Sequence, residues 1–244
     1  MKDRKNRREL PSVIIFILFV FSFAAIFIFS PKKEYSENEK RVLSDAPVFN
    51  IESVKSGKFA EDSEKYISDH FPMRDGFVGI NSYFSLLTGK SCENGIYKAA
   101  DGYLLAAPSD YSEERLNKNI EEINRFAENC KLKATLLAVP TAGYMLEDKL
   151  PQLHKKYNDG EIVKILTEKC KVPSPDIAAY FNTVSDDDIY YKTDHHLTSR
   201  GALYLYEKFC DLNGSAPCEF TLSETYDGFY GTAYSKSGLW LQKP

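Results

Sequence analysis

The chain has 244 residues, a length that suits one domain of about 200 residues with an appended segment. Hydrophobic residues make up 43% of it and charged residues 27%, which are the values of an ordinary globular protein. The formal net charge of −4 gives no electrostatic reason to expect nucleic acid or an acidic polymer as a partner, so we predict that the chain binds no nucleic acid.

The N-terminal segment departs from this average. Residues 1–9 are strongly basic, and an apolar run from Leu10 to Phe29 follows. Twenty helical residues at 1.5 Å each span roughly 30 Å, which is enough to cross a bilayer. Positive charges on the N-terminal side of such a run are expected to stay in the cytoplasm. The pattern predicts a cytoplasmic tail at 1–9, a transmembrane anchor at 10–30 and a single-pass cell-membrane protein whose body is extracytoplasmic.

A cleaved signal peptide is the alternative interpretation of this segment. Signal peptides usually have an apolar region of about 7–15 residues that ends in small residues of the Ala-x-Ala type. Here the run ends in the sequence FIFSPKK, a poor cleavage site, and there is no cysteine for lipid attachment. We therefore favour a retained anchor, although both interpretations export the body of the protein.

Export permits disulfides, and the chain has five cysteines. The odd number leaves at least one of them without a partner in this chain. Cys210 and Cys218 flank the turn-rich sequence DLNGSAP, which is able to bring them together; small buried residues are the alternative interpretation. No Cys-x-x-Cys spacing occurs, so zinc-ribbon and thioredoxin-like sites are not supported.

Residues 31–50 are polar, contain two prolines and are interpreted as a linker, and 51–244 are predicted to be the extracytoplasmic domain. Apolar residues recur at helical spacing before Pro72, which should end a first helix, and a second helix is expected from about Asp75 to Leu87. The sequence GIYKAADGYLLAA then predicts two strands joined by a turn at Asp101-Gly102.

Helices and strands alternate in the rest of the chain. A helix with a capping box at Asp110 and Glu113 precedes the run LKATLLAVP, which is too short for a helix and predicts a buried strand. DGEIVKILTEKC predicts a helix, PDIAAYF a strand or short helix, and DIYYKTD a strand before a helix from about Ser199 to Leu212 that ends at Asn213-Gly214. This alternation predicts an α/β domain with a largely parallel sheet, in which ligands bind at the carboxyl ends of strands.

The sequence YYKTDHHLTSRGALYLYEKF, which runs from Tyr190 to Phe209, holds two of the four histidines of the chain. An Asp beside a His is the orienting half of a nucleophilic triad, in which the His takes a proton from a Ser or Cys and the Asp orients the ring. Asp194 and His196 are two residues apart, so a turn is able to bring the carboxylate and the ring together. A pKa near 6.5 suits histidine to proton transfer near neutral pH.

Two alternatives stay open for this cluster. Asp194 and Thr198 are residue types favoured at helix starts, so the cluster can be a polar helix start on the surface. A metal site needs three or four ligands, and no spacing ties the other histidines, His70 and His154, to this cluster. We therefore predict no metal.

The same segment resembles the signature of the DHHW family, named for Asp-His-His-Trp, and of the related alginate O-acetyltransferase proteins, whose version is Asp-x-His-Trp. Leu197 stands where the family has Trp, but the aromatic pair and Thr before the Asp and the Gly-Ala after it agree. The resemblance covers about residues 36–238. It includes the sequences SENEKRVLSDAPVF, KYISDHFPMRDGFVGINS, GIYKAADGYLL, VPTAGYMLEDKLP and YDGFYGTAYSKSG.

The resemblance implies a fold similar to SGNH hydrolases in permuted order, with a Ser-His-Asp triad that moves acyl groups on extracellular carbohydrate. Asp194 corresponds to the triad Asp and His196 to the triad His, whereas His195 occupies a variable position and is not assigned a catalytic role. The implied activity is that of a cell-surface polysaccharide O-acetyltransferase or acetylesterase. The resemblance also suggests a membrane-bound acyltransferase as the partner that supplies the acyl group, and it implies no metal or organic cofactor.

The nucleophilic Ser of the family follows downstream, in an Asp-Ser or Gly-Asp-Ser context. No Gly-Asp-Ser occurs here, and the late serines stand in TLSET and AYSKSG, which do not resemble that turn. We therefore expect the sequence to be truncated before the nucleophile, with the Ser outside this chain. A non-catalytic extracytoplasmic carbohydrate-binding or scaffold protein is the alternative function.

Overall fold

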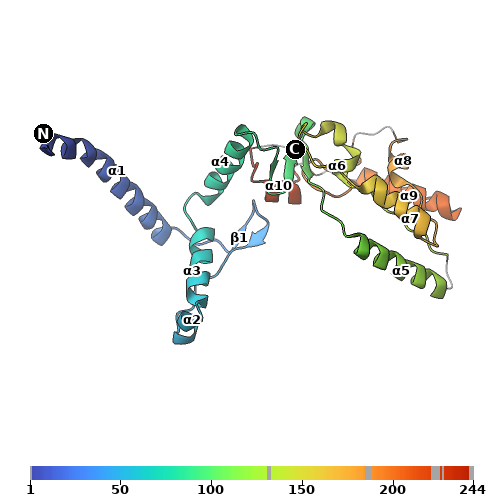
Figure 1. Ribbon diagram of the computed structural model, residues 1–244, viewed down its shortest axis with the longest axis horizontal. Coiled ribbons are helices and arrows are strands. Elements are labelled where there is room, and N and C mark those ends of the chain that lie inside the picture. The colour runs from blue at the N-terminus through green and yellow to red at the C-terminus, as the bar shows by residue number, and fades with distance from the viewer. Residues whose placement is uncertain (1, 131–132, 185–187, 221–225, 227, 242–244) are drawn as a thin grey trace. The chain divides into compact units, whose positions relative to one another are not determined.

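The computed structural model describes residues 2–130, 133–184, 188–220, 226 and 228–241, with side chains from residue 10 onward. The chain divides into two units, residues 1–81 and residues 82–244, and the boundary falls inside one helix, α4 (Arg74–Leu87) (Figure 1).

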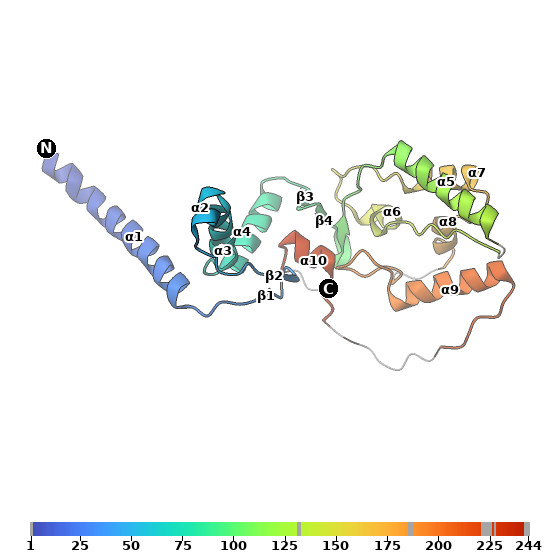
Figure 2. The same cartoon turned by 90° about the horizontal axis from the view of Figure 1, so that it is seen from below.

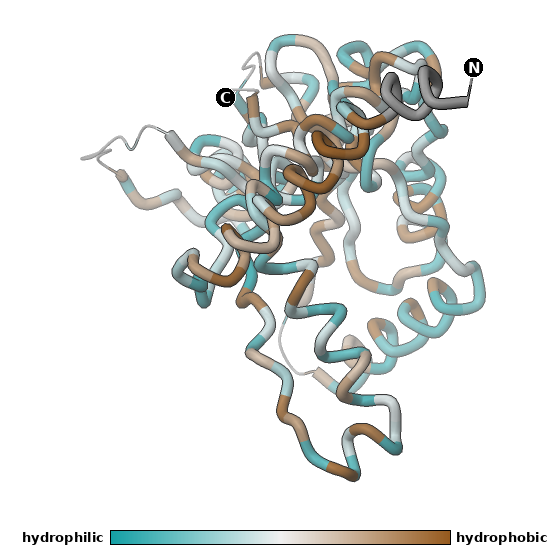
Figure 3. The backbone as a smooth tube through the Cα atoms, turned by 90° about the vertical axis from the view of Figure 1, so that its left-hand side faces the viewer, coloured by the Kyte–Doolittle hydropathy of each residue, from teal (hydrophilic) through white to brown (hydrophobic). Residues whose placement is uncertain are grey.

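The first unit begins with α1 (Lys2–Phe29), which contains the predicted apolar helix. Its segment Leu10–Phe29 has a mean hydropathy of 3.0 and none of it is buried. Figure 3 shows this helix coloured brown along the turns that follow its grey N-terminal end. Length and composition allow the helix to cross a membrane, and a signal sequence has the same features.

A hairpin follows α1 in the segment interpreted as a linker. Strands β1 (Tyr35–Ser36) and β2 (Arg41–Val42) pair antiparallel. Arg41 forms an ion pair with Asp69 at 2.5 Å, and Asp69 also accepts hydrogen bonds from the backbone and hydroxyl of Ser44, at 2.9 and 2.8 Å. The Arg41 guanidinium outweighs burial and holds the pKa of Asp69 well below its usual range. These bonds fasten the hairpin to the end of α3 (Lys58–Asp69).

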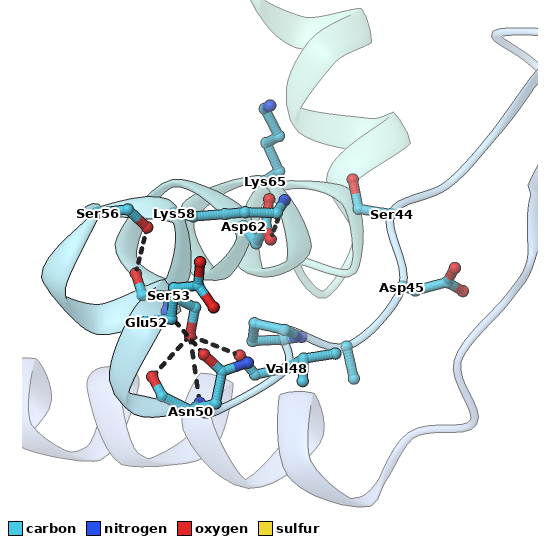
Figure 4. A pocket seen from close by; sticks show the side chains of 12 residues that line it. Ser44, Asp45, Val48, Asn50, Glu52, Ser53, Ser56, Lys58, Asp62 and Lys65 are labelled. Atoms are coloured by element: carbon cyan, nitrogen blue, oxygen red, sulfur yellow. Dashed lines mark hydrogen bonds and ion pairs between the residues drawn. The ribbon is translucent and has the colours of Figure 1, made fainter.

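Helix α2 (Ile51–Lys55) begins at a capping box. Asn50 Oδ1 accepts from the Ser53 backbone at 2.7 Å, and Ser53 Oγ accepts from the Asn50 backbone at 3.2 Å (Figure 4). The segment around α2 and the first turns of α3 encloses a pocket of about 550 Å³. Helix α3 ends at Asp69, before Pro72, as the sequence predicted.

The second unit is built on a three-stranded antiparallel meander. Its strands are β3 (Cys92–Glu93), β4 (Ile96–Lys98) and β5 (Leu104–Ala106). The predicted hairpin is confirmed, since β4 and β5 pair with Tyr97 opposite Leu105. The connection is a short 3-10 turn, η1 (Ala100–Gly102), in which Asp101 and Gly102 have φ values of 55° and 84°. Asp and Gly tolerate this left-handed conformation better than other residues.

The remaining regular elements among the described residues are helical, and four of them match predicted helices. They are α5 (Glu113–Asn129), α7 (Asp159–Lys169), α8 (Ile177–Phe181) and α9 (Ser199–Asn213), which ends at Gly214 with φ 67°. The others are α6 (Ala142–Met145), the 3-10 turn η2 (Glu147–Lys149) and α10 (Thr232–Ser237). The predicted capping box of α5 is wrong, because the cap is Ser112, whose hydroxyl accepts from the backbone of Arg115 at 3.3 Å.

The predicted largely parallel sheet is not confirmed, because the described residues form only short antiparallel sheets. Residues 133–139 of the apolar run belong to no strand, although 134–138 are partly buried; Leu136 donates one backbone hydrogen bond to the carbonyl of Pro173, at 2.9 Å. The segment before α9 makes an isolated antiparallel bridge between Tyr190 and Leu197. A strand requires a neighbour that continues the ladder along its length, and among the described residues these two segments have none.

The pairing of Cys210 with Cys218, which their spacing allowed, is not formed, and all five cysteines are free. Cys210 is buried, whereas Cys218 is exposed and donates its backbone N–H to the hydroxyl of Tyr206 at 3.1 Å.

Two apolar clusters form the core of the second unit. One joins β5 to α6, α8 and the segment before α9; its buried members are Ala99, Tyr103, Leu105, Ala142, Ile177, Phe181, Ile189 and Tyr190. The other packs α10 and the residues after it against β4 and β5, and its buried members are Ile96, Leu104, Ala233, Tyr234 and Leu239. Figure 2 shows α10 beside β4 on the side of the strand away from α5 and α9. The Asp-His-His segment therefore lies between two packed cores.

Candidate active site

The Asp-His-His segment is a tight turn held by backbone hydrogen bonds. Tyr191 donates to the carbonyl of His196 at 3.2 Å, and Thr198 donates to the carbonyl of Ile189 at 2.9 Å. Leu104 of β5 donates to the carbonyl of Lys192 at 2.7 Å, which joins the turn to the meander. These bonds hold Asp194, His195 and His196 at the tip of the turn.

Helix α9 begins directly after this turn. The hydroxyl of Thr198 accepts from the backbone of Gly201 at 3.0 Å and caps the helix, as the helix-start interpretation expected for Thr198. Gly201 is required here, because a Cβ at this position would lie 2.2 Å from the carbonyl oxygen of Ile189. Asp194 has a different role, since its carboxylate accepts from residues outside the helix.

The carboxylate of Asp194 is buried and accepts four hydrogen bonds. Oδ1 accepts from the backbone N–H of His196 at 3.0 Å and from Nδ1 of the same residue at 2.5 Å. Oδ2 accepts from the backbone N–H and the hydroxyl of Thr232, at 2.7 and 3.0 Å. Only 4% of Asp194 is exposed. The turn therefore does bring the carboxylate and the His196 ring together, as the spacing suggested.

These hydrogen bonds decide the charge of Asp194. Burial alone raises the pKa of a carboxyl group, because it disfavours the charged form. Here the backbone and side-chain donors of Thr232 and His196 outweigh burial and lower the pKa of Asp194 to about 2. The group is therefore a carboxylate at neutral pH, and a carboxylate only accepts hydrogen bonds.

The charge of Asp194 in turn sets the histidine tautomers. Because the carboxylate accepts, His196 must donate from Nδ1–H, and the Nε2 atom of its neutral ring is a free base. The Thr232 hydroxyl donates to Asp194, so it accepts from Nδ1–H of His195, at 2.9 Å. Both rings are exposed, and their centroids lie 3.9 Å apart. Residues 194–196 lie in a bend rather than in an extended strand, so the two histidine rings come together instead of pointing to opposite faces.

Thr232 is the residue of this site that sequence reasoning missed. It begins α10, 38 residues after Asp194. Gly231 before it lets the chain approach, because a Cβ there would lie 2.4 Å from the Cβ of Asp194 and 2.7 Å from the carbonyl oxygen of Thr193. Ala233 and Tyr234 donate to that same carbonyl, at 3.1 and 3.2 Å. The sequence did contain a signal for Thr232, because this residue lies in YDGFYGTAYSKSG, one of the segments that carry the family resemblance.

The site opens into a cleft of about 960 Å³. Asp194, both histidines and Thr232 line it, and Tyr111, Tyr157, Asn158 and Asp159 are among its other lining residues. Aromatic rings and a few polar groups around a concave site are typical of small-ligand pockets.

Asp194, His195 and His196 also offer three metal-ligand atoms that lie within 4.8 Å of one another. Both carboxylate oxygens of Asp194, however, already accept backbone N–H groups, and Nδ1 of both rings is hydrogen-bonded. A metal bound by these atoms would have to displace those bonds. The donor set therefore fits a hydrogen-bonded His-Asp pair better than a metal centre.

None of the described serines donates to His196. Ser235 and Ser237 are buried, and their hydroxyls donate to the carbonyls of Gly231 and Tyr234, at 3.2 and 3.0 Å. Ser223 lies outside the described residues. Within the described part of the chain the site holds the His196 ring and the carboxylate of Asp194 that orients it.

Comparison with known proteins supports the family that the sequence suggested. Residues 98–211 match the family described as SGNH hydrolase-like domain, acetyltransferase AlgX. The fold is similar to the crystal structure of a DHHW family protein from Eubacterium siraeum DSM 15702, with a TM-score of 0.50 and 23% sequence identity. That match covers 61% of this chain and 50% of the solved chain. A search of curated proteins finds no match. The chain therefore contains an SGNH hydrolase-like domain of the AlgX type at residues 98–211, and its fold is similar to that of a DHHW family protein.

Proposed function

We propose that this domain supplies the His-Asp pair of a Ser-His-Asp site that transfers acetyl groups to, or removes them from, a cell-surface polysaccharide. The observation that carries this proposal is the 2.5 Å hydrogen bond from Nδ1 of His196 to the buried carboxylate of Asp194, at the edge of a large cleft. It fixes the ring in the tautomer that a general base needs. The family match to acetyltransferase AlgX supports the choice of an acetyl group.

In the proposed reaction, a serine hydroxyl attacks the carbonyl carbon of an acetyl donor, and Nε2 of His196 accepts the hydroxyl proton. The tetrahedral intermediate collapses, the bond to the donor oxygen breaks, and the imidazolium returns its proton to that oxygen. A sugar hydroxyl or water then attacks the acetyl-serine in the same way, and its proton passes through His196 to the serine oxygen. The first acceptor gives a transferase and the second an esterase.

Asp194 stabilises the His196 cation in each step. Its carboxylate is already ionised at neutral pH and already hydrogen-bonded, so little reorganisation is required when the ring gains a proton. Because no described serine donates to His196, we propose that the nucleophile lies outside the described residues.

The cleft suits a carbohydrate acceptor. Asp110, Asn158 and Asp159 present carboxylate and amide groups able to bond sugar hydroxyls, beside the rings of Tyr111 and Tyr157. We further propose that α1 anchors the domain at the extracytoplasmic face of the cell membrane, where a membrane-bound acyltransferase supplies the acetyl group. The apolar segment Leu10–Phe29 supports the anchor.

The test uses the protein expressed in full from its gene, with an activated acetyl ester as donor and oligosaccharides as acceptors. Ester hydrolysis and the mass of the acceptors would be followed for the parent and for His196→Ala. We expect acetyl release or acceptor acetylation that His196→Ala reduces by about 10²–10⁴-fold. For residues 31–244 alone we expect no turnover that depends on His196.

A non-catalytic carbohydrate-binding protein is the second candidate, and the lack of a described serine at His196 favours it. This function predicts that oligosaccharide binding, followed by calorimetry, is retained in His196→Ala while neither protein releases acetate. Binding without turnover in the full gene product would replace the enzyme proposal with this one.

A further inference from the structure

Helix α1 contacts, through two side chains near its C-terminal end, the junction between α3 and α4, which we call the elbow and define as residues 66–80. The Phe23 ring lies 5.6 Å from Phe71 and 6.1 Å from Phe77, centroid to centroid, and Phe27 lies 6.0 Å from Tyr66. Within Leu10–Phe29, Phe23 and Phe27 are the two residues that are partly buried, and the others are exposed. They are four residues apart and so share one face of the helix.

The position of this contact along α1 sets the depth of the elbow. Crossing a hydrocarbon core of about 30 Å takes about twenty helical residues, which is the whole of Leu10–Phe29. Phe23 lies six residues before Phe29, or about 9 Å from the end of that segment. Lys32 then turns back over the Phe27 ring, with Nζ 3.7 Å from the centroid. Such a lysine keeps its charge at the membrane–water interface. Phe23 lies one helical turn deeper than Phe27, so the rings of Phe71 and Phe77 that contact it lie below the lipid headgroups.

The elbow presents further apolar side chains to its surroundings. Ile67, Met73, Phe77 and Ile80 are 50%, 72%, 45% and 68% exposed. Three of its charged side chains are paired within the unit instead. Arg74 contacts Glu39, Asp75 accepts from Asn38 at 2.7 Å, and Asp69 pairs with Arg41. Two of these charges are therefore in ion pairs, and that of Asp75 is hydrogen-bonded to a neutral amide. The apolar surface of the elbow adjoins α1 where Phe71 and Phe77 meet Phe23.

We propose that the elbow inserts into the extracytoplasmic leaflet, where lipid at the boundary between headgroups and acyl chains covers its exposed apolar side chains. The inference rests on the proposed membrane anchoring of α1. A depth of about 9 Å matches the 5–10 Å at which apolar faces of interfacial helices lie. Through its three ring contacts with Phe23 and Phe27 of α1, the elbow holds the first unit against the membrane surface at a fixed height.

The experiment places tryptophan probes in the full chain, reconstituted in phosphatidylcholine vesicles whose acyl chains carry bromine near the headgroup or near the bilayer centre. The probes are Phe77→Trp and Met73→Trp in the elbow, Phe16→Trp in α1, and Lys55→Trp as the matched control. Lys55 is exposed in the same unit, and the first eight residues of α3, about 12 Å, separate it from the elbow. The signal of native Trp240 in the parent is subtracted.

We expect both elbow probes to lose fluorescence with lipids brominated near the headgroup and to emit at shorter wavelength, while Lys55→Trp does neither. Phe16→Trp should be quenched by lipids brominated near the bilayer centre. If that probe is quenched but the elbow probes behave like Lys55→Trp, the elbow inference is wrong and the anchor stands. If no bromine position quenches Phe16→Trp, the anchor and the elbow inference are both wrong.

Discussion

Thr232 holds the Asp194 carboxylate with both its backbone N–H and its hydroxyl, at 2.7 and 3.0 Å, across 38 residues of chain. The same hydroxyl is within 2.9 Å of Nδ1 of His195. Thr232 therefore donates both hydrogen bonds that Oδ2 of Asp194 accepts, while His196 donates both that Oδ1 accepts. The start of α10 is thus as much a part of the site as the turn that carries the histidines.

Replacing Thr232 tests this relationship. Thr232→Val keeps the branched shape and the backbone N–H but removes the hydroxyl, so Oδ2 of Asp194 keeps a single donor. We expect the free energy of unfolding to fall by about 1–3 kcal/mol, as for hydrogen bonds to charged groups, and the pKa of Asp194 to rise. Thr232→Ser keeps the hydroxyl and is the control. Chemical denaturation measures the first effect and carboxyl NMR titration the second; equal stability of the Val and Ser variants would contradict the assigned role.

The two histidines are expected to contribute unequally to activity. In the protein with its nucleophile, His196→Ala should lose about 10²–10⁴-fold in acetyl turnover, because its Nε2 is the base. His195→Ala should lose much less, because that ring contacts Asp194 mainly through the Thr232 hydroxyl. Turnover with and without a chelator checks this. A metal site predicts a different pattern: His195→Ala and His196→Ala would lose turnover equally, and zinc would restore the activity that the chelator removes.

Gly231 is expected to be intolerant of a side chain. Gly231→Ala places a Cβ 2.4 Å from the Cβ of Asp194 and 2.7 Å from the carbonyl of Thr193, so the two segments must separate. A loss of about 1–3 kcal/mol in unfolding free energy is expected, as in other overpacked sites. The control is Gly76→Ala in α4, where a Cβ meets nothing within 4 Å. That variant should be neutral or more stable by up to about 1 kcal/mol, and similar losses in both variants would count against the close packing.

Acid should weaken the site through Asp194. Its pKa is lowered to about 2 in the folded protein from a usual value of 3.8, so the folded state binds the proton less readily than the unfolded state. The resulting stability is fully present above about pH 4 and is lost as the pH falls through 2. The Asp194→Asn variant has no carboxyl group to protonate at this position. Its melting temperature should therefore fall less than that of the parent between pH 5 and pH 2. Asp69, whose pKa is also lowered, stays intact in both proteins and serves as the internal reference. Parallel melting curves against pH would show that Asp194 does not titrate as assigned.

Local sequence patterns determined most of the helices. The period of apolar residues, Pro72 and Gly214 predicted where α3 and α9 end, and Asp101-Gly102 predicted the turn of the β4–β5 hairpin. These features depend on backbone preferences within a few residues of chain, so they can be read without the fold. The pairing of Asp194 with His196 was foreseeable for the same reason, since the two residues are only two apart and both of their bonds are made inside one turn.

Contacts between distant segments decided the rest. Residues 133–139 have the composition of a buried strand, but whether they pair depends on a neighbour that composition does not supply, and they remain outside the described sheets. The close contact between the tilted rings of His195 and His196 follows from the turn that the Tyr190–Leu197 bridge closes. Thr232 reaches Asp194 only because Gly231 allows two backbones 38 residues apart to meet. A hydrogen bond between distant segments forms only when the packed fold brings its donor and acceptor together. The sequence by itself shows which polar groups are present, but the tertiary structure decides which of them come into contact.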